Sequence, residues 1–306
     1  MLTDKRILIT GVTGKAVIPI AAALAKNNEV YGVARFASEA AREKTERAGI
    51  IACPADFDSS DLSALPEEVD YVLHFAWMRA PIEELDRAIR VNVEAAGLIL
   101  QRYHGAKAAL VVSSQGVYAT NPDPQHHYTE TDPIGRGATA WAQTSPATKL
   151  GLEAVARFCG RGFDLPITIA RLNTVIGPRK AFFASHFDAV RAGQEIILPG
   201  EPNYHTPIHS DDMIAHIEPL LDAASTSATI VNWCGDETVT TQDTLARTAE
   251  LIGKPAHIRV INDPAVPAGN ANDTARRYAI TGPCSVPFWN GFNQMARDIA
   301  AEVAPV

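Results

Sequence analysis

The sequence predicts an α/β protein with a doubly wound parallel sheet and a smaller lobe interleaved toward its C-terminal end. Through the first half of the chain, short apolar runs typical of strands buried on both faces alternate with segments of helical spacing. A pair of glycines follows the first of these runs directly, and the alternation loosens after about residue 171. In such sheets ligands bind outside the carboxyl ends of the strands.

The elements can be assigned in chain order from these patterns. Strands are expected at 6–10, 29–34, 49–53, 70–76, 108–114, 166–171, 229–233 and 257–261. Helices are expected at 16–27, 37–48, 81–103, 146–161, 211–224, 242–252 and 288–303. Between residues 173 and 209 the chain is rich in Gly, Pro and aromatic residues, and no helix or strand is predicted there.

Composition excludes several classes of protein. The 306 residues carry 27 Lys and Arg against 35 Asp and Glu, a net charge of −8, so we expect no nucleic-acid partner. The longest apolar run, 16–25, contains Pro19 and is too short to cross a bilayer. Four dispersed cysteines indicate reduced thiols, and the chain enters its first strand without a leader pattern. A cytoplasmic protein with no membrane partner is the expectation.

The segment "ILITGVTG" places Gly11 and Gly14 between the first strand and the first helix. Glycines at such a turn let a pyrophosphate approach the backbone N–H groups at a helix N-terminus, as in Rossmann-type dinucleotide-binding folds. A tight turn without a ligand is the alternative interpretation. Val17 stands where a third glycine would bring the helix closer to the sheet.

Arg35 ends the second strand, 24 residues after Gly11, where an acidic residue would bind a ribose 2′-hydroxyl. A guanidinium at that place suits a 2′-phosphate, so NADP(H) is expected in preference to NAD(H). The alternative is a solvated arginine stacked on adenine. The dinucleotide-binding lobe is then assigned to 1–172 and 209–235, and a substrate-binding cap to 173–208 and 236–306.

With these segments in order, the chain resembles the extended short-chain dehydrogenase/reductase family of NAD(P)-dependent epimerases, dehydratases and reductases. The resemblance spans about residues 6–224. It rests on "ILITGVTG", "ADF" at Asp56, "VLHFAW" at Ala76, "RVNVEAAGLIL" at Asn92, "VVSSQGVYA", "ARLNTVIGP" and "TPIHSDDM". The resemblance implies cofactor binding by Gly11, Thr13, Gly14, Lys15, Arg35, Asp56, Phe57, Ala76 and Lys149.

The family's catalytic set is a Tyr-x-x-x-Lys pair with a Ser or Thr. Ser114 matches the serine and Lys149 the lysine, but Ser145 stands at the tyrosine position. An aliphatic hydroxyl is a far weaker acid than a phenol, so Ser145 is a poor proton donor even beside an ammonium. Ser145 followed by Pro146 also has the pattern of a helix N-cap, which is the alternative role.

Replacement acids are sought in the loop after Tyr118, which contains His126, His127, Tyr128 and Glu130; solvent-exposed loop positions are the alternative. The adjacent histidines have no third ligand at metal-binding spacing, so no metal is expected. The candidate catalytic residues are therefore Ser114, Lys149 and Ser145.

Substrate contacts are expected from Trp77, Tyr118, Asn173 and His205. In nucleotide-sugar enzymes of the family an arginine near the late cap motif holds a diphosphate, and here His205 stands in its place, which disfavours such a substrate. Arg179 and Lys180 are candidates for binding an anionic group, with a solvated surface pair as the alternative. Apolar walls could come from Trp77, Met78, Trp141, Phe182, Phe183 and Phe187, although core packing explains each of them equally well.

Three functions are compatible with these residues. The first is an NADP(H)-dependent oxidoreductase that transfers hydride to or from a small or medium carbonyl or hydroxyl compound. The second is an epimerase, dehydratase, lyase or isomerase with no net redox change. The third is a non-catalytic NAD(P)-sensing protein that kept the cradle. The family often forms homodimers, which is a further expectation for this chain.

Overall fold

The computed structural model describes residues 2–59, 61–139, 142–177, 182–262 and 266–303. The contacts between residues divide the chain into two compact units, each assembled from three separate segments. Unit 1 comprises Met1–Val117, Ile134–Arg171 and Ile214–Val231, and unit 2 comprises Tyr118–Pro133, Leu172–Met213 and Asn232–Val306.

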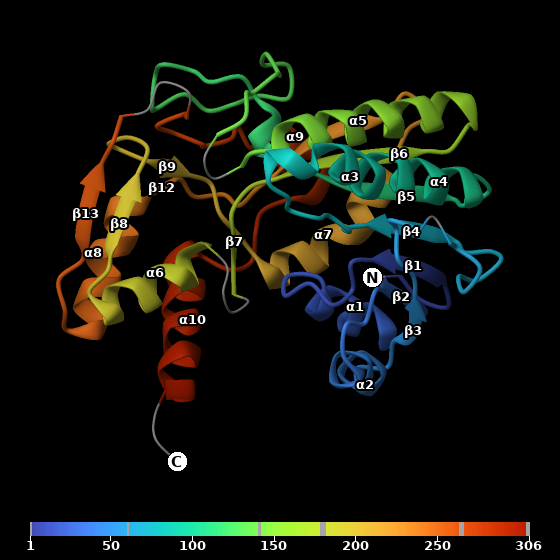
Figure 1. Cartoon of the computed structure of the whole chain (residues 1–306), viewed down its shortest axis with the longest axis horizontal. Helices are drawn as coiled ribbons and strands as arrows, with labels where there is room; N and C mark the ends of the chain where they lie inside the picture. The colour runs from blue at the N-terminus through green and yellow to red at the C-terminus, as the bar shows by residue number, and fades with distance from the viewer. Residues whose placement is uncertain (1, 60, 140–141, 178–181, 263–265, 304–306) are drawn as a thin grey trace. The chain divides into compact units, whose positions relative to one another are not determined.

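Unit 1 is built on a seven-stranded sheet with the strand order β11-β6-β5-β4-β1-β2-β3 (Figure 1). The strands are β1 Arg6–Thr10, β2 Glu29–Ala34, β3 Ile51–Pro54, β4 Tyr71–His74, β5 Ala108–Ser114, β6 Ile167–Leu172 and β11 Thr229–Trp233. The two halves of the sheet meet at β1, where Ile9 is in register with Gly32 of β2 and with Leu73 of β4, both in parallel. This reversal of strand order is the switch point at which Rossmann-type folds bind their ligands, and the predicted α/β fold class is confirmed.

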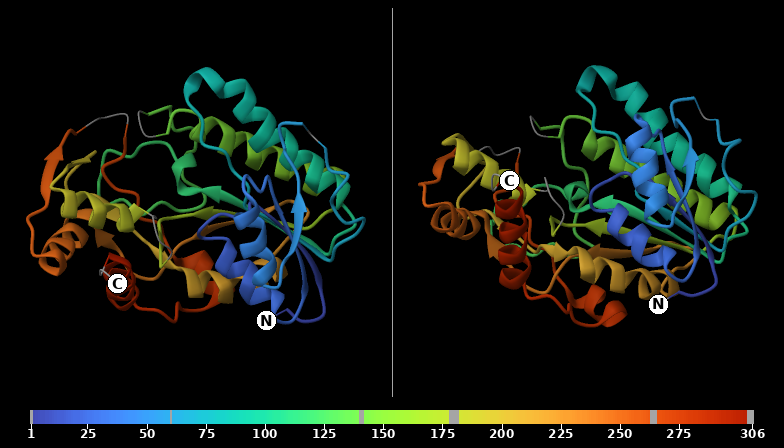
Figure 2. Two further views of the ribbon diagram at one scale, coloured as in Figure 1. Left: turned by 60° about the horizontal axis from the view of Figure 1, so that its bottom comes forward. Right: turned by 90° about the horizontal axis from the view of Figure 1, so that it is seen from below.

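Helices cover both faces of this sheet. They are α1 Ile18–Ala25, α2 Glu39–Arg47, α3 Leu85–Ile89, α4 Ala95–Arg102, α5 Ser145–Gly162 and the C-terminal part of α7 Ser210–Asp222. In Figures 1 and 2 α4 and α5 lie together on one face, with α1 and α2 on the other. The described helices include none long and apolar enough to span a membrane.

The predicted strands and helices match the structure within two residues at each end, with one exception. The predicted helix 81–103 is broken into the 3-10 turn Ile82–Glu84, α3, the π-helical turn Arg90–Glu94 and α4. A π turn adds a residue to the helical ring, and such insertions are frequent at functional sites. Asn92 lies within this turn.

A buried ion pair lies in the core of unit 1. Arg171 at the end of β6 donates to both carboxylate oxygens of Glu153 on α5, at 2.9 and 2.8 Å, and Ser113 Oγ donates to Glu153 Oε1 at 2.7 Å. The side chains of Arg171 and Glu153 are 1% and 3% exposed. A bidentate guanidinium–carboxylate pair of this kind ties α5 to two neighbouring strands.

Unit 2 has three two-stranded sheets and four helices among its described residues. The strand pairs are β7 Val175–Ile176 with β10 Ile208–His209, β9 Tyr204–His205 with β12 Val239–Thr240, and β8 Glu195–Leu198 with β13 His257–Val260. The helices are α6 Phe182–Ala192, α8 Thr241–Ile252, α9 Ala275–Thr281 and α10 Phe288–Val303. The helix α6 and the strand β8 fall in the stretch for which no element was predicted.

The boundaries of the units differ from the predicted lobes mainly at one segment, although residues 172, 209–213 and 232–235 of the predicted dinucleotide-binding lobe also fall in unit 2. Residues 118–133, assigned to the dinucleotide-binding lobe from sequence, belong to unit 2. The reason is local hydrogen bonding: Tyr118 Oη donates to Asn232 Oδ1 at 2.5 Å, and Asn232 Nδ2 donates to the carbonyl of Tyr128 at 2.7 Å.

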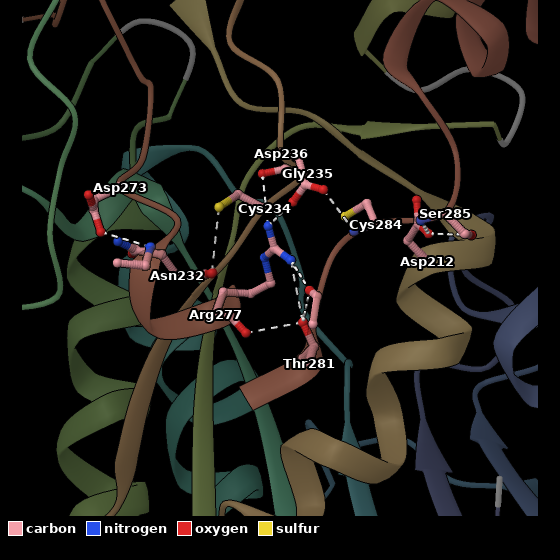
Figure 3. A network of polar contacts seen from close by, with 12 residues as sticks. Asp212, Asn232, Cys234, Gly235, Asp236, Asp273, Arg277, Thr281, Cys284 and Ser285 are labelled. Carbon is pink, nitrogen blue, oxygen red and sulfur yellow. Dashed lines mark hydrogen bonds and ion pairs between the residues drawn. The ribbon is translucent and has the colours of Figure 1, made fainter. Parts of the chain in front are cut away.

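A second buried arginine organises the C-terminal part of unit 2 (Figure 3). Arg277 on α9 has no exposed surface, pairs with Asp236 and donates to the carbonyl of Gly282 at 2.6 Å. The other oxygen of Asp236 accepts the backbone N–H of Cys284 at 2.8 Å. The network thus joins α9 to the segments before and after it. The four cysteines of the chain are free thiols.

Replacing Arg171 tests the contribution of the ion pair in unit 1. Arg171→Met leaves the Glu153 carboxylate buried without its counter-charge, so the free energy of unfolding should fall by about 3–5 kcal/mol. Chemical denaturation measures the loss. The double variant Glu153→Leu/Arg171→Met should recover most of it, whereas Arg6→Ala, which removes an exposed pair with Glu29, should change stability little. A double variant as unstable as Arg171→Met alone would contradict this account.

Candidate cofactor-binding and active site

The glycine turn after β1 brings two backbone segments into contact. Gly11 has φ +71°, and a Cβ built on it would lie 2.9 Å from Cα of Ala76. Both facts exclude an ordinary side chain at this position. The turn leads into α1 through Gly14 and Val17, so its N–H groups precede a helix N-terminus, as a phosphate cradle requires.

Thr10 fixes the segment that follows β4. Its hydroxyl oxygen accepts the N–H groups of Phe75 and Ala76 at 3.2 and 3.0 Å and lies 3.1 Å from Nδ1 of His74. A hydroxyl that accepts two bonds still has one hydrogen to donate, so Nδ1 of His74 accepts it. Burial, helped by the charge of Lys149, lowers the pKa of His74 to about 3, and the imidazole is neutral.

These segments line a cleft of about 420 Å³ in unit 1. Its wall includes most of the predicted cofactor residues, namely Gly11, Thr13, Gly14, Arg35, Asp56, Phe57 and Ala76, together with Trp77 and Met78. The other two predicted cofactor residues, Lys15 and Lys149, do not line the cleft; Lys15 is solvent-exposed and Lys149 is buried. The cradle at Gly11, which a single Cβ would fill, and the polar residues beyond it fit a dinucleotide laid across the switch point of the sheet.

Arg79 and Arg87 also line this cleft and were not predicted. The guanidinium of Arg87 is held by Asp58 and Glu84 at 2.8 and 2.9 Å, in partly exposed ion pairs. The Asp58 partner keeps the pKa of that arginine above its usual range, and Arg87 in turn lowers the pKa of Asp58. Neither arginine follows a strand in a recognisable motif, so no pattern in the sequence points to them.

Lys149 lies in the first turns of α5 and is 7% exposed. Its Nζ donates to the backbone carbonyl of Val112 at 2.7 Å. Burial lowers the pKa of this lysine to about 7, and the nearby carboxylate of Glu153 partly opposes the shift. The ammonium is therefore poised between its charged and neutral forms near neutral pH.

Glu153 was missed in the sequence, although a signal exists. It lies four residues after Lys149, so both side chains share one face of α5. A carboxylate on the buried face of a helix needs a partner, and Arg171 at the end of a buried strand is such a partner. Neither residue forms part of a motif read from the sequence.

The two serines of the predicted catalytic set are half-buried. Ser114 Oγ accepts the N–H of Gly116 at 3.0 Å, which leaves its hydrogen for a ligand oxygen. Ser145 is the first residue of α5, and the N-cap is Thr144, whose side chain makes no capping bond. The alternative role of Ser145 as N-cap is therefore wrong: Thr144 occupies that position and donates its hydroxyl to the carbonyl of Ala80 at 2.9 Å.

The predicted substrate residues of unit 2 are held by hydrogen bonds. Tyr118 is fully buried and stacks on Tyr128 with ring centroids 5.0 Å apart. Asn173 donates to Asn272 Oδ1 at 2.5 Å. Nδ1 of His205 lies 3.1 Å from Thr174 Oγ1, and its Nε2 lies 2.9 Å from Asn203 Oδ1.

The loop proposed to supply a replacement acid uses its polar groups within unit 2. Nε2 of His126 lies 2.8 Å from Asp132 Oδ2, and Nε2 of His127 lies 3.0 Å from Thr238 Oγ1. Tyr128 is 2% exposed, and its hydroxyl accepts the N–H of Asn121 at 2.9 Å. Glu130 accepts the N–H of Asn232 at 2.8 Å. Tyr128 is therefore a core residue rather than an exposed acid.

The expected apolar walls divide into two groups. Trp77 and Met78 line the cleft of unit 1, whereas Phe183 and Phe187 belong to the core of unit 2, packed around Phe292. Core packing, the alternative given for each aromatic residue, is the correct one for these two. Phe182 is 41% exposed. Trp141, Arg179 and Lys180 lie outside the described residues.

The fold and the cleft of unit 1 define the class of NAD(P)-binding Rossmann-type enzymes. The chain belongs to the NAD dependent epimerase/dehydratase family, whose model matches residues 7–234. It thus belongs to the extended short-chain dehydrogenase/reductase type, a group of enzymes, as the motifs indicated. No curated protein matches the sequence.

Solved structures of the same fold cover nearly the whole chain. UDP-glucuronic acid 4-epimerase from Bacillus cereus, in complex with UDP-glucuronic acid and NAD, is 20% identical with a TM-score of 0.82, covering 97% of this chain and 99% of that one. The dTDP-glucose 4,6-dehydratase DesIV of Streptomyces venezuelae, with NAD bound, is 19% identical with a TM-score of 0.81 and 97% coverage of both chains. UDP-glucose 4-epimerase of Thermus thermophilus, in complex with NAD, is 19% identical with a TM-score of 0.78, covering 97% and 100%.

Substituting Gly11 tests the cradle. Gly11→Ala places a methyl group against the Ala76 backbone at a positive φ, so binding of NAD(H) and NADP(H) should weaken by at least about tenfold. Isothermal titration calorimetry measures the affinity. Gly105→Ala, at a glycine whose Cβ would meet nothing within 4 Å, is the matched control and should bind like the unmodified protein. Equal affinity in the two variants would refute the cradle.

Proposed function

We propose that this protein is a nicotinamide-dependent epimerase or dehydratase that acts on a hydroxyl-bearing carbon without net redox change. The observation that carries the proposal is Lys149, a buried ammonium bonded to Val112 at the carboxyl side of the sheet and beside Trp77, which lines the dinucleotide cleft. Membership of a family of epimerases and dehydratases supports this redox-neutral reaction over the net oxidoreductase first predicted from the sequence.

A bound nicotinamide dinucleotide would supply the hydride acceptor and donor. The chain's own residues bind and orient: the turn at Gly11 and Gly14 receives the phosphates, and Ser114 Oγ has its hydrogen free to polarise a substrate oxygen. Lys149, with a pKa of about 7, can hold or release a proton at Nζ near neutral pH. Because Ser145 is too weak an acid, we assign proton movement to Lys149 through water.

The proposed cofactor preference is NADP(H). Arg35 is exposed at the end of β2 and lines the cleft together with Asp56. A guanidinium there favours a 2′-phosphate through charge-assisted hydrogen bonds. The structural neighbours contain NAD, but at 19–20% identity their likeness to this chain is one of fold.

The proposed substrate is a small or medium hydroxyl or carbonyl compound without a diphosphate. Burial, with a smaller effect of His186, lowers the pKa of His205 to about 3, so this side chain is neutral. Its neighbours Asn203 and Thr174 are neutral as well. Neutral amide, hydroxyl and imidazole groups suit a polyhydroxyl ligand better than a dianion.

A non-catalytic NAD(P)-binding protein is the second candidate, favoured by one observation. Ser145, at the position of the family's tyrosine, begins α5 half-buried and offers no group that titrates near neutral pH. In that case the cleft would bind the dinucleotide with no turnover. Lys149 would then serve only in binding the cofactor.

The redox balance separates the candidate functions. With hydroxyl and carbonyl compounds, including nucleotide sugars, an epimerase or dehydratase should give product by chromatography while the absorbance of bound cofactor stays constant. Ser145→Tyr should raise the rate by about 10²–10⁴-fold, because a phenol beside Lys149 restores a competent acid. Stoichiometric consumption of cofactor would instead support the oxidoreductase. Tight cofactor binding with no product in either variant would support the binding protein.

Substituting Arg35 tests the proposed preference for NADP(H) over NAD(H). Arg35→Ala should weaken NADP(H) binding roughly 10–100-fold, the effect of losing a charge-assisted hydrogen bond, and leave NAD(H) binding nearly unchanged. Calorimetric titration with both cofactors measures this. Arg42→Ala, which removes an exposed arginine of α2 paired with Glu46, is the control. An equal loss for both cofactors would contradict the 2′-phosphate contact.

A further inference from the structure

The indole ring of Trp77 lies close to two cations in unit 1. Its ring centroid is 5.5 Å from Nζ of Lys149 and 5.7 Å from Cζ of Arg79. Both distances fall within the range of cation–π attraction, which is strongest for the indole ring and greater where the cation is shielded from water. Lys149 is shielded in this way, because only 7% of its surface is exposed.

The main chain on both sides of Trp77 is fixed by side chains. Before it, the N–H of Ala76 is bonded to Thr10 Oγ1 at 3.0 Å. After it, Asn92 of the π-helical turn accepts the N–H of Met78 at 2.6 Å and donates to the carbonyl of the same residue at 2.8 Å. The indole is therefore carried by a backbone with little freedom to move, and its position relative to Lys149 is set by the fold.

Lys149 needs such a neighbour. A lysine side chain is flexible and strongly hydrated, and burial removes the water that would otherwise solvate it. The residue one turn earlier on the same helix face, Ser145, is too short to cover the ammonium. The indole of Trp77 supplies an aromatic face at the distance where the cation is stabilised.

We propose that Trp77 is the positioning residue for Lys149: its indole face holds the ammonium against the Val112 carbonyl and favours its charged form, a role that Ser145 cannot fill. The importance of Lys149 for the reaction rests on the proposed function above. The contact itself does not rest on that function, because Trp77, Lys149 and Val112 form it within unit 1 and no cofactor or substrate takes part.

Two titratable groups interact with Lys149, namely Glu153 on α5 and His74 on β4. Three arginines lie next to Glu153 or to the indole: Arg157 and Arg171 pair with Glu153, and Cζ of Arg79 lies 5.7 Å from the ring centroid of Trp77. Glu153 favours the ammonium, and the neutral His74 adds no charge. A substitution of Trp77 alone changes none of these charged residues, so a shift in the pKa of Lys149 reports the loss of the indole ring.

The test is an NMR titration of the full chain labelled with ¹³C at lysine Cε, with the signal of Lys149 assigned by its absence from Lys149→Met. In the unmodified protein the midpoint should lie near pH 7. Trp77→Leu keeps an apolar side chain but removes the ring, so the midpoint should move to lower pH by roughly 0.5–1.5 units. Trp77→Phe keeps a weaker aromatic face and should give a smaller shift in the same direction.

The control is Trp289→Leu, at a tryptophan packed on Phe292 in unit 2, which should leave the midpoint unchanged. An unchanged or raised midpoint in Trp77→Leu, with Trp77→Phe also unshifted, would overturn the proposal. If Trp77→Leu does not fold, the sign of the shift in Trp77→Phe decides. The titration uses no cofactor, so a failure of the proposed function appears separately, as the absence of dinucleotide binding by the unmodified protein.

Discussion

The close approach of the Gly11 turn to the strand end at Ala76 is the constraint on which the site of unit 1 depends. Only glycine fits at position 11, because a Cβ there would lie 2.9 Å from Cα of Ala76. The same approach lets Thr10 accept the N–H groups of Phe75 and Ala76. These bonds direct the residues after Ala76 along the cleft. The lack of a side chain at Gly11 therefore determines both the shape of the phosphate cradle and the path of the segment that carries Trp77.

Charge burial in unit 1 follows one pattern. Arg171 and Glu153 neutralise each other in a bidentate pair, so the interior has no net charge from them. Lys149 forms no such ion pair within the described part of the chain; its ammonium has a carbonyl at 2.7 Å, an indole ring at 5.5 Å and the favourable charge of the nearby Glu153 carboxylate. Partial compensation of this kind leaves the pKa near 7 instead of fixing the charge. The helix α5 thus carries Glu153, whose charge is fixed by an ion pair, and Lys149, whose charge can change near neutral pH.

The fold was largely predictable because its signals are local. Buried parallel strands are continuous apolar runs, and the glycine turn has a fixed place after the first of them. The π-helical turn that contains Asn92 could not be predicted, since the apolar spacing of this segment is that of a regular helix. Glu153 with Arg171, and Trp77 with Lys149, join residues 18 and 72 positions apart, and such pairings appear only when the chain is folded. The place of the segment 118–133 in unit 2 could not be predicted for the same reason, because its partner Asn232 is more than 100 residues away.

That separation has a consequence for biogenesis. Asn232 binds the earlier segment through three hydrogen bonds, with Tyr118, Tyr128 and Glu130. A ribosome delivers Tyr118 114 residues before this asparagine. During that interval the Tyr118 hydroxyl and the Tyr128 carbonyl lack their bonds to Asn232, so the segment 118–133 cannot complete its packing, and incompletely packed chains are prone to aggregate. Slow translation should therefore burden this protein more than one whose domains emerge as unbroken stretches.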